Sequence, residues 1–103
     1  MYLSVARDFT PHPGPRYARQ GAGSGEAFRK MLVEAFQKAR RLIVDLDGTS
    51  GFGSSFLDEA FGGLIRSEGM TRDELTHRLV IKSDLDESYK SEIQEALELA
   101  RPQ

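Results

Sequence analysis

The 103-residue chain contains no cysteine, so it can form no disulfide bond and offers no thiolate for catalysis or for the common zinc sites. It also has no run of about 18 apolar residues, the length that a membrane-spanning helix needs. A surplus of positive charge is missing too, because the net charge is -2. These absences argue against a membrane partner and against a basic surface that binds nucleic acid.

The residues that are present fit an ordinary globular protein. Hydrophobic residues make up 39% of the chain and charged residues 29%, a balance that favours a folded domain with one core. The length predicts a single domain over residues 1–103, with no room for an inserted cap or a second lobe. The N-terminal MYLSVARDF lacks the basic-then-apolar order of a secretion signal, so we expect a cytoplasmic protein.

Strand and helix patterns alternate along the chain. Leu3, Val5 and Phe9 follow a period of two and predict a strand, whereas the Pro- and Gly-rich segment 11–25 predicts a loop with a short extended piece. Helices are expected over 25–40 (with Ser24 as N-cap), 54–69, a short stretch from Thr71, and 87–100; further strands are expected over 41–47 and 78–83. The result is an α/β fold with a small, mostly parallel sheet and helices packed on it. The near-continuous apolar run RLIVDLD favours a central strand covered on both faces.

Two adjacent glycines, Gly62 and Gly63, interrupt the helix expected over 54–69. Together they cost roughly 2 kcal/mol of helix propensity relative to alanine. We therefore expect them to allow close packing of this helix against a strand or against another protein.

The strand at 41–47 ends in a motif that could be catalytic. LIVDLDGTS, Leu42 to Ser50, resembles the start of the active site in haloacid dehalogenase phosphatases. That resemblance implies that Asp45 attacks phosphorus, that Asp47 protonates the leaving group, and that both hold magnesium. Ser83 ends the next strand, at the place where the hydroxyl residue of the second sequence motif of those enzymes is expected. The other interpretation is that Asp47 and Gly48 simply close the strand in a turn.

Other requirements of the phosphatase chemistry are not met by the sequence. Those enzymes also need a lysine and a further acidic pair from later strands, yet only one helix follows Ser83. Their first motif lies near the N-terminus, whereas this one follows a strand, a long loop and a helix. We therefore predict a non-enzymatic protein without cofactor or metal, and keep a magnesium-dependent phosphotransfer enzyme using Asp45 and Asp47 as the alternative.

The segment VDLDGTSGFGSSFLDEAFGGLIR, residues 44–66, resembles STAS-fold proteins, the bacterial anti-sigma factor antagonists. In them a central strand leads through a loop to a helix that opens at a pair of serines. The resemblance is closest to a bacterial STAS-like family of unknown function and covers nearly the whole chain. The matching residues are Arg16, Tyr17, Ser24, Gly25, Glu26, Phe28, Arg29, Gly51, Gly53, Ser54, Ser55, Phe56, Leu57, Ala60, Phe61, Gly62 and Gly63.

This resemblance implies a regulatory domain that binds a protein. In the antagonists a kinase-type ATPase phosphorylates a serine at the start of that helix, and the added charge decides which partner is bound. By position, Ser54 would be the acceptor and Ser55 its neighbour. The chain departs from the antagonists in having Gly53 in place of their aspartate and Phe56 in place of their glycine. The alternative is that one serine is only an N-cap, worth ~1 kcal/mol.

A phenylalanine in the preceding loop is a candidate contact for that partner. Phe52 lies between Gly51 and Gly53, in a loop that can bury little. Because aromatic anchors often dominate protein interfaces, we predict partner contacts at Gly51, Phe52, Gly53 and Phe56. The expectation is a solvent-accessible stretch from 51 to 56, with Ser54 or Ser55 capping the helix.

Overall fold

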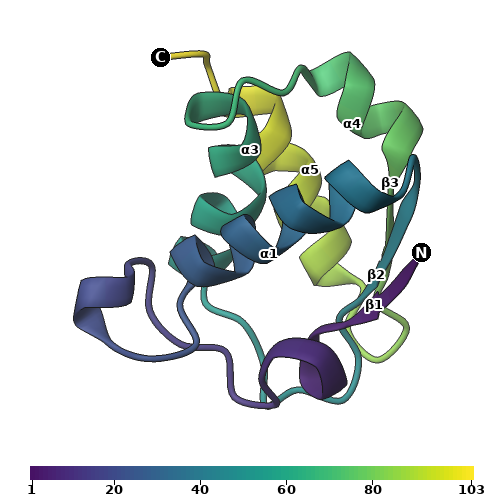
Figure 1. Cartoon of the computed structure of the whole chain (residues 1–103). Coiled ribbons are helices and arrows are strands. Elements are labelled where there is room, and N and C mark those ends of the chain that lie inside the picture. The colour runs from purple at the N-terminus through teal and green to yellow at the C-terminus, as the bar shows by residue number, and fades with distance from the viewer.

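A computed structural model describes all residues from 1 to 103 and places a three-stranded parallel sheet at one side of the molecule (Figure 1). The strands are β1 (Tyr2–Ser4), β2 (Leu42–Asp45) and β3 (Leu79–Lys82), in the order β1-β2-β3. Val44 lies opposite Leu3 on one side and Ile81 on the other. The central position predicted for β2 is confirmed.

The helices form where the apolar periodicity predicts them. Helix α1 is capped by Ser24, whose hydroxyl accepts a hydrogen bond from the amide of Ala27 at 3.0 Å. A capping box between Thr71 and Glu74 starts the short helix α4. The bounds are α1 Gly25–Lys38, α2 Ser54–Leu57, the π-helical turn η3 Asp58–Gly62, α3 Gly63–Arg66, α4 Arg72–Arg78 and α5 Ser88–Leu99. Because α2, η3 and α3 follow one another without a break, we call them together the 54–66 helix.

The first strand is shorter than the predicted one. It ends at Ser4, and Val5–Phe9 form the π-helical turn η1. The Ser4 hydroxyl accepts from the amide of Arg7 at 3.2 Å, while the Asp8 carboxylate accepts from the amide of Ser4 at 2.8 Å. These local side-chain bonds replace the strand pairing that the alternation predicted. The loop that follows contains a 3-10 turn, η2 (Ala18–Gln20), beyond an extended residue at Tyr17.

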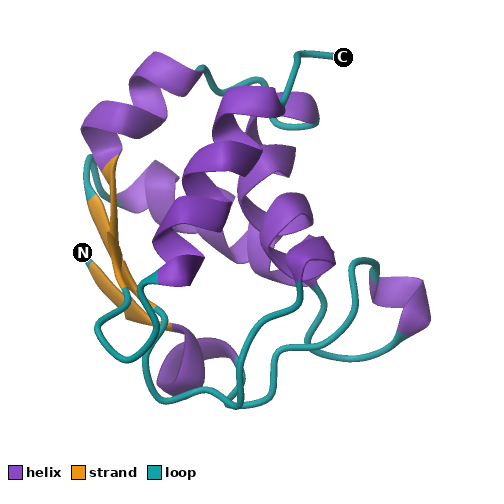
Figure 2. Ribbon diagram, turned by 180° about the vertical axis from the view of Figure 1, so that it is seen from behind, coloured by secondary structure: helices purple, strands orange, loops and turns teal.

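Helix α1, the 54–66 helix and α5 all lie on the same side of the sheet (Figure 2). Leu42 and Val44 point toward these helices and are fully buried, whereas Ile43 between them is 39% exposed. The prediction that β2 is covered on both faces is therefore wrong: the fold has two layers, and the second face of the sheet is open. No helix is both long enough and apolar enough to cross a membrane.

Aromatic rings fill the space between α1 and the 54–66 helix. Phe28 stacks on Phe56 with ring centroids 6.0 Å apart, and meets Phe61 edge to face at 6.1 Å. All three rings are almost completely buried. This packing fixes the start of the 54–66 helix, which carries the candidate site.

Candidate functional site

The candidate site is the loop Gly51–Gly53 and the first turn of the 54–66 helix. Ser54 and Ser55 are exposed, and nothing lies within 4 Å of the position that a Cβ on Gly53 would take. The N-cap is Gly53, and no side chain caps the helix. The prediction that Ser54 or Ser55 caps it is wrong, because both serines lie inside the helix, past the N-cap position. Instead, Ser54 Oγ donates to Glu92 Oε1 on α5 at 2.9 Å.

The two phenylalanines beside the serines lie in different environments. Phe52 is half-buried, and its ring meets Tyr89 edge to face at 5.2 Å and Phe56 at 5.4 Å. Phe56 is only 1% exposed. The prediction of Phe56 as a partner contact is therefore wrong, since its ring belongs to the core. Phe52 keeps an accessible surface.

Tyr89 holds the loop in place, although the sequence pattern indicated only an apolar position of the last helix. Its hydroxyl accepts a hydrogen bond from the amide of Phe52 at 3.3 Å. The same oxygen lies 3.2 Å from where a Cβ on Gly51 would be, and the φ of Gly51 is +120°. A side chain at Gly51 would therefore strain the backbone and crowd the tyrosine. The loop residues are positioned by α5, 36 or more residues later, and only the long-range contact reveals it.

A groove of about 220 Å³ runs beside Ser54, between the 54–66 helix and α5. Its lining residues are Ser54, Leu57, Asp58, Glu92, Glu95, Ala96 and Leu99. Three of these carry carboxylates and none is basic. Asp58 is paired with Arg16 and Arg66, so Glu92 and Glu95 are the carboxylates that make the surroundings of the Ser54 hydroxyl acidic.

A buried ion-pair network lies further along the same helix. Arg29 of α1 bonds Glu59 through Nη1 and Glu68 through Nε, the latter at 2.8 Å. Arg16 reaches the same place and bonds Asp58 at 2.7 Å and Glu59 at 3.2 Å. Burial works against ionisation of Asp58, but the bonds from its arginine partners outweigh it and hold its pKa below the usual value. Every buried side-chain donor and acceptor in the structure has a partner.

The two adjacent glycines make room for this network. A Cβ on Gly63 would lie 2.8 Å from Cδ of Arg29, and one on Gly62 would lie 2.8 Å from Nη1 of Arg66. Close packing was expected here, but the neighbours are arginine side chains, not a strand or another protein. Gly25 has a comparable role, because a Cβ there would come within 2.6 Å of the Phe56 carbonyl oxygen.

Asp45 and Asp47 lie at the carboxyl end of the sheet, as the alternative enzyme hypothesis requires. Asp45 accepts a hydrogen bond from the Tyr2 hydroxyl, and its Oδ1 accepts from the amide of Asp47 at 2.9 Å. The structure also brings a lysine here, which the sequence did not suggest: Lys82 Nζ lies 3.0 Å from Asp47 and 3.1 Å from Asp84.

Asp47 braces the loop between β3 and α5. It accepts hydrogen bonds from the amides of Leu85 at 3.0 Å and Asp84 at 3.1 Å. The bond from Leu85 and the ammonium of Lys82 lower the pKa of Asp47. Ser83 is buried, and its hydroxyl donates to the Asp86 carbonyl at 2.5 Å. The carboxylates and the serine are thus engaged within the chain, and no group of three or more Asp, Glu or His is arranged to hold a metal ion.

A model of the STAS-like domain of unknown function (DUF4325) matches residues 24–89, well over half of the chain. The chain belongs to this STAS-like family. A search of curated proteins and a search of solved structures each found no match. The predicted family and α/β class of this STAS-like domain are confirmed.

Several of the residues that carried the resemblance gather at two places in the STAS-like domain, and others, such as Phe28 and Phe61, belong to its core. Arg29, Gly62 and Gly63 belong to the buried network, together with Arg16, which lies before the matched segment. Gly51, Gly53 and the serine pair belong to the accessible start of the 54–66 helix. These residues of the chain therefore form one group that holds the helix and another that lies at its accessible start.

Proposed function

We propose that this STAS-like domain is a non-catalytic regulatory domain that binds a protein partner around Ser54, and that phosphorylation of Ser54 or Ser55 switches this binding. The observation that carries the proposal is the exposure of both serines at a helix start where neither hydroxyl serves as a cap. By analogy with the anti-sigma factor antagonists, the partner is a kinase-type ATPase.

A phosphate on Ser54 would change the local surface strongly. The hydroxyl now donates to Glu92, and a phosphate in its place carries about -1.5 to -2 charges and donates no such bond. Glu95 lines the same groove, and none of the residues that line it is basic. The phosphate would therefore break the contact with α5 and turn toward solvent, where a partner that tolerates the hydroxyl would meet a double negative charge.

Phe52 is the contact residue that we assign to the unphosphorylated state. Its ring is half-buried and its orientation is fixed by Tyr89 and by the backbone of Gly51. A preorganised aromatic side chain loses little freedom on binding, which favours its use as an anchor. The distance along the chain between Phe52 and Ser54 is two residues, so one partner can contact both.

The test combines binding and stability. Wild type, Ser54→Asp and the matched control Ser91→Asp, an exposed serine on α5, are used as bait in the native host and are melted in parallel. We expect Ser54→Asp to change the free energy of unfolding by less than ~1 kcal/mol, because a negative charge suits a helix start and the repulsion by Glu92 is weak at an exposed site. Association of the partner should weaken by a few kcal/mol, since the charge would be left unpaired in an apolar contact.

The control and the modification state decide the interpretation. Ser91→Asp should retain the same partners as wild type, and mass spectrometry of protein from the native host should find phosphate on Ser54 or Ser55. If Ser54→Asp unfolds, or keeps every wild-type partner at equal strength, the switch hypothesis is wrong.

A further inference from the structure

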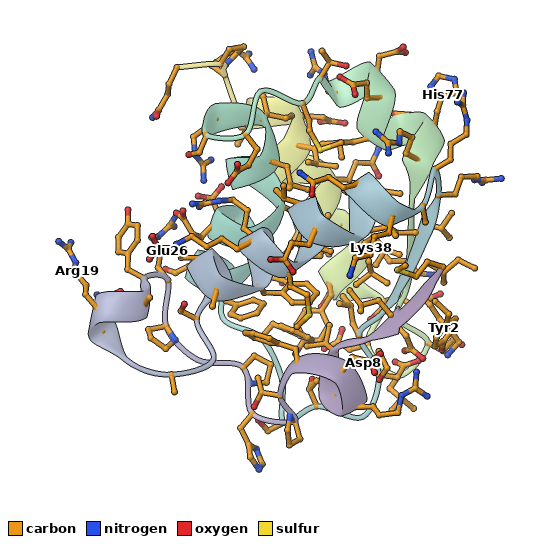
Figure 3. The ribbon with its side chains drawn as sticks, viewed as in Figure 1. Tyr2, Asp8, Arg19, Glu26, Lys38 and His77 are labelled. Atoms are coloured by element: carbon orange, nitrogen blue, oxygen red, sulfur yellow. The ribbon has the colours of Figure 1, made fainter.

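The uncovered face of the sheet is apolar at its centre. Tyr2 is 45% exposed, and Ile43 and Val80 are each 39% exposed. The strand register places Tyr2 opposite Ile43 and Ile43 opposite Val80, so the three side chains form one row across all three strands. Tyr2 lies on the side of the sheet away from α1 (Figure 3). Single exposed apolar residues are normal, but a contiguous row on a sheet face indicates a contact surface.

Charges of opposite sign lie on the two sides of this row, at the amino and the carboxyl ends of the strands. Asp45 follows Ile43 by two residues in β2, so the alternation of the strand puts both on the open face. Arg41 directly precedes the strand and is exposed. Arg40 and Arg41 are exposed at the amino end of the strands. At the carboxyl end, Asp45, Asp47 and Asp84 surround the single ammonium of Lys82, which leaves that end negative.

We propose that a second copy of this chain packs on the open sheet face, related to the first by a two-fold axis that runs across the strands. Such an axis brings the two Tyr2–Ile43–Val80 rows together and makes the strands of the two copies antiparallel. Arg41 of each copy then faces the acidic end of the other. A two-fold axis along the strands would instead put Arg41 against Arg41. The charge pattern is thus complementary to itself in one arrangement only.

The size of the face sets the strength of the contact. Strands of three and four residues, about 4.8 Å apart with about 3.3 Å per residue, cover on the order of 200 Å². A stable complex buries about 800 Å² per partner. The face is about a quarter of that size, so we expect a weak, reversible dimer. Because the helices lie on the other face of the sheet, Ser54 stays accessible in both copies, and this proposal does not depend on the phosphorylation switch.

The first experiment is sedimentation equilibrium of the whole chain from about 0.01 to about 1 mM. We expect a monomer–dimer equilibrium in the wild type, and a rise in Kd of at least about tenfold in Ile43→Lys. The matched control is Leu99→Lys, because Leu99 is 67% exposed on α5, away from the sheet. It should dimerise like the wild type.

The second experiment tests the direction of the axis by charge exchange. Arg41→Glu and Asp84→Lys should each dimerise more weakly than wild type, whereas a mixture of the two variants should form a heterodimer in which both charge contacts are attractive. Concentration-dependent amide shifts in the wild type provide a readout that needs no variant, and should be confined to β1, β2, β3 and the charged residues at the ends of these strands, Arg41, Asp47 and Asp84.

Three results would overturn the proposal. They are a wild-type monomer at about 1 mM, equal weakening by Leu99→Lys and Ile43→Lys, or concentration-dependent shifts that map to the helices. A dimer through this face whose mixed variants fail to associate would show that the axis is wrong.

Discussion

The start and the far part of the 54–66 helix differ in how firmly their polar groups are held. At the start, Ser54 makes one side-chain hydrogen bond to Glu92 at the surface. One turn later, Glu59 is 8% exposed and is bonded by both Arg29 and Arg16. A buried group of this kind cannot change its charge or lose a partner without a large loss of stability, whereas an exposed serine can. The start of the helix is therefore the part where the proposed switch could act without loss of stability, whereas the second half holds the fold together.

The strongest test of this contrast removes one member of the buried network. Arg29→Met should lower the free energy of unfolding by about 3 kcal/mol, because it takes a principal partner from the buried Glu59 carboxylate. The neighbouring exposed residue provides the control, and Lys30→Met should change stability by less than about 0.5 kcal/mol. Urea unfolding measures both. Equal stability of Arg29→Met and wild type would mean that the network does not hold the helix.

Substitution of one glycine at the start and one in the second half of the 54–66 helix should change the free energy of unfolding in opposite directions. In Gly63→Ala, the overlap with Arg29 at 2.8 Å should cost more than the gain in helix propensity, for a net loss of about 1 kcal/mol. Gly53→Ser meets open space and adds a side chain that can cap the helix, so stability should rise by a few tenths of a kcal/mol. Thermal unfolding of the two variants measures this difference, and two changes of the same sign would contradict it.

Acid should lower the stability of the fold through the ion-pair network of the 54–66 helix. The pKa of Asp58 is held below its usual value by bonds from Arg16 and Arg66 in spite of burial, so the unfolded chain binds this proton at a higher pH than the folded chain. The stabilisation is present above the unfolded pKa of about 4 and is lost as pH falls through it toward the lower folded pKa. Urea midpoints should therefore drop between about pH 5 and pH 3, and the drop should be smaller in Asp58→Asn than in wild type.

The smallest expected effect concerns the carboxyl end of the sheet, where polar groups are also fully engaged. Because Asp45 and Asp47 bond Tyr2, Lys82 and the β3–α5 loop, we expect no hydrolysis of an aryl phosphate in the presence of magnesium. Turnover above the buffer rate that disappears in Asp45→Asn would replace the non-catalytic proposal with the phosphotransfer alternative.

The sequence predicted the elements whose apolar spacing is regular. Helix α1, the central place of β2 and the capping box at Thr71 follow from local patterns, and the family follows from residues 44–66. Strand β1 was predicted too long, because Ser4 and Asp8 satisfy backbone amides that a strand would have paired. Local propensity could not report this competition.

Long-range contacts account for the other errors. The exposure of Ile43 depends on whether a second helical layer exists, which the residues of one strand do not reveal. Gly63 lies against Arg29, more than thirty residues away, so its role appears only in three dimensions. At the candidate site the error is one of register: Gly53, one position before the predicted Ser54, is the N-cap, and the buried ring of Phe56 follows from the same geometry.

The π-helical turn Asp58–Gly62 changes the direction in which side chains after it point, relative to those before it in the 54–66 helix. A π-helical turn holds more residues than an α-helical turn, and each residue of an α-helix advances the direction of the side chains by about 100°. The turn therefore sets the angle between Ser54, which faces α5, and Gly63, which faces Arg29 of α1. Deletion of one residue within it would restore a continuous α-helix yet rotate the two contacts out of alignment, so that only one of them could form. The fold therefore requires the length of this turn as well as the carboxylates and the glycine that it carries.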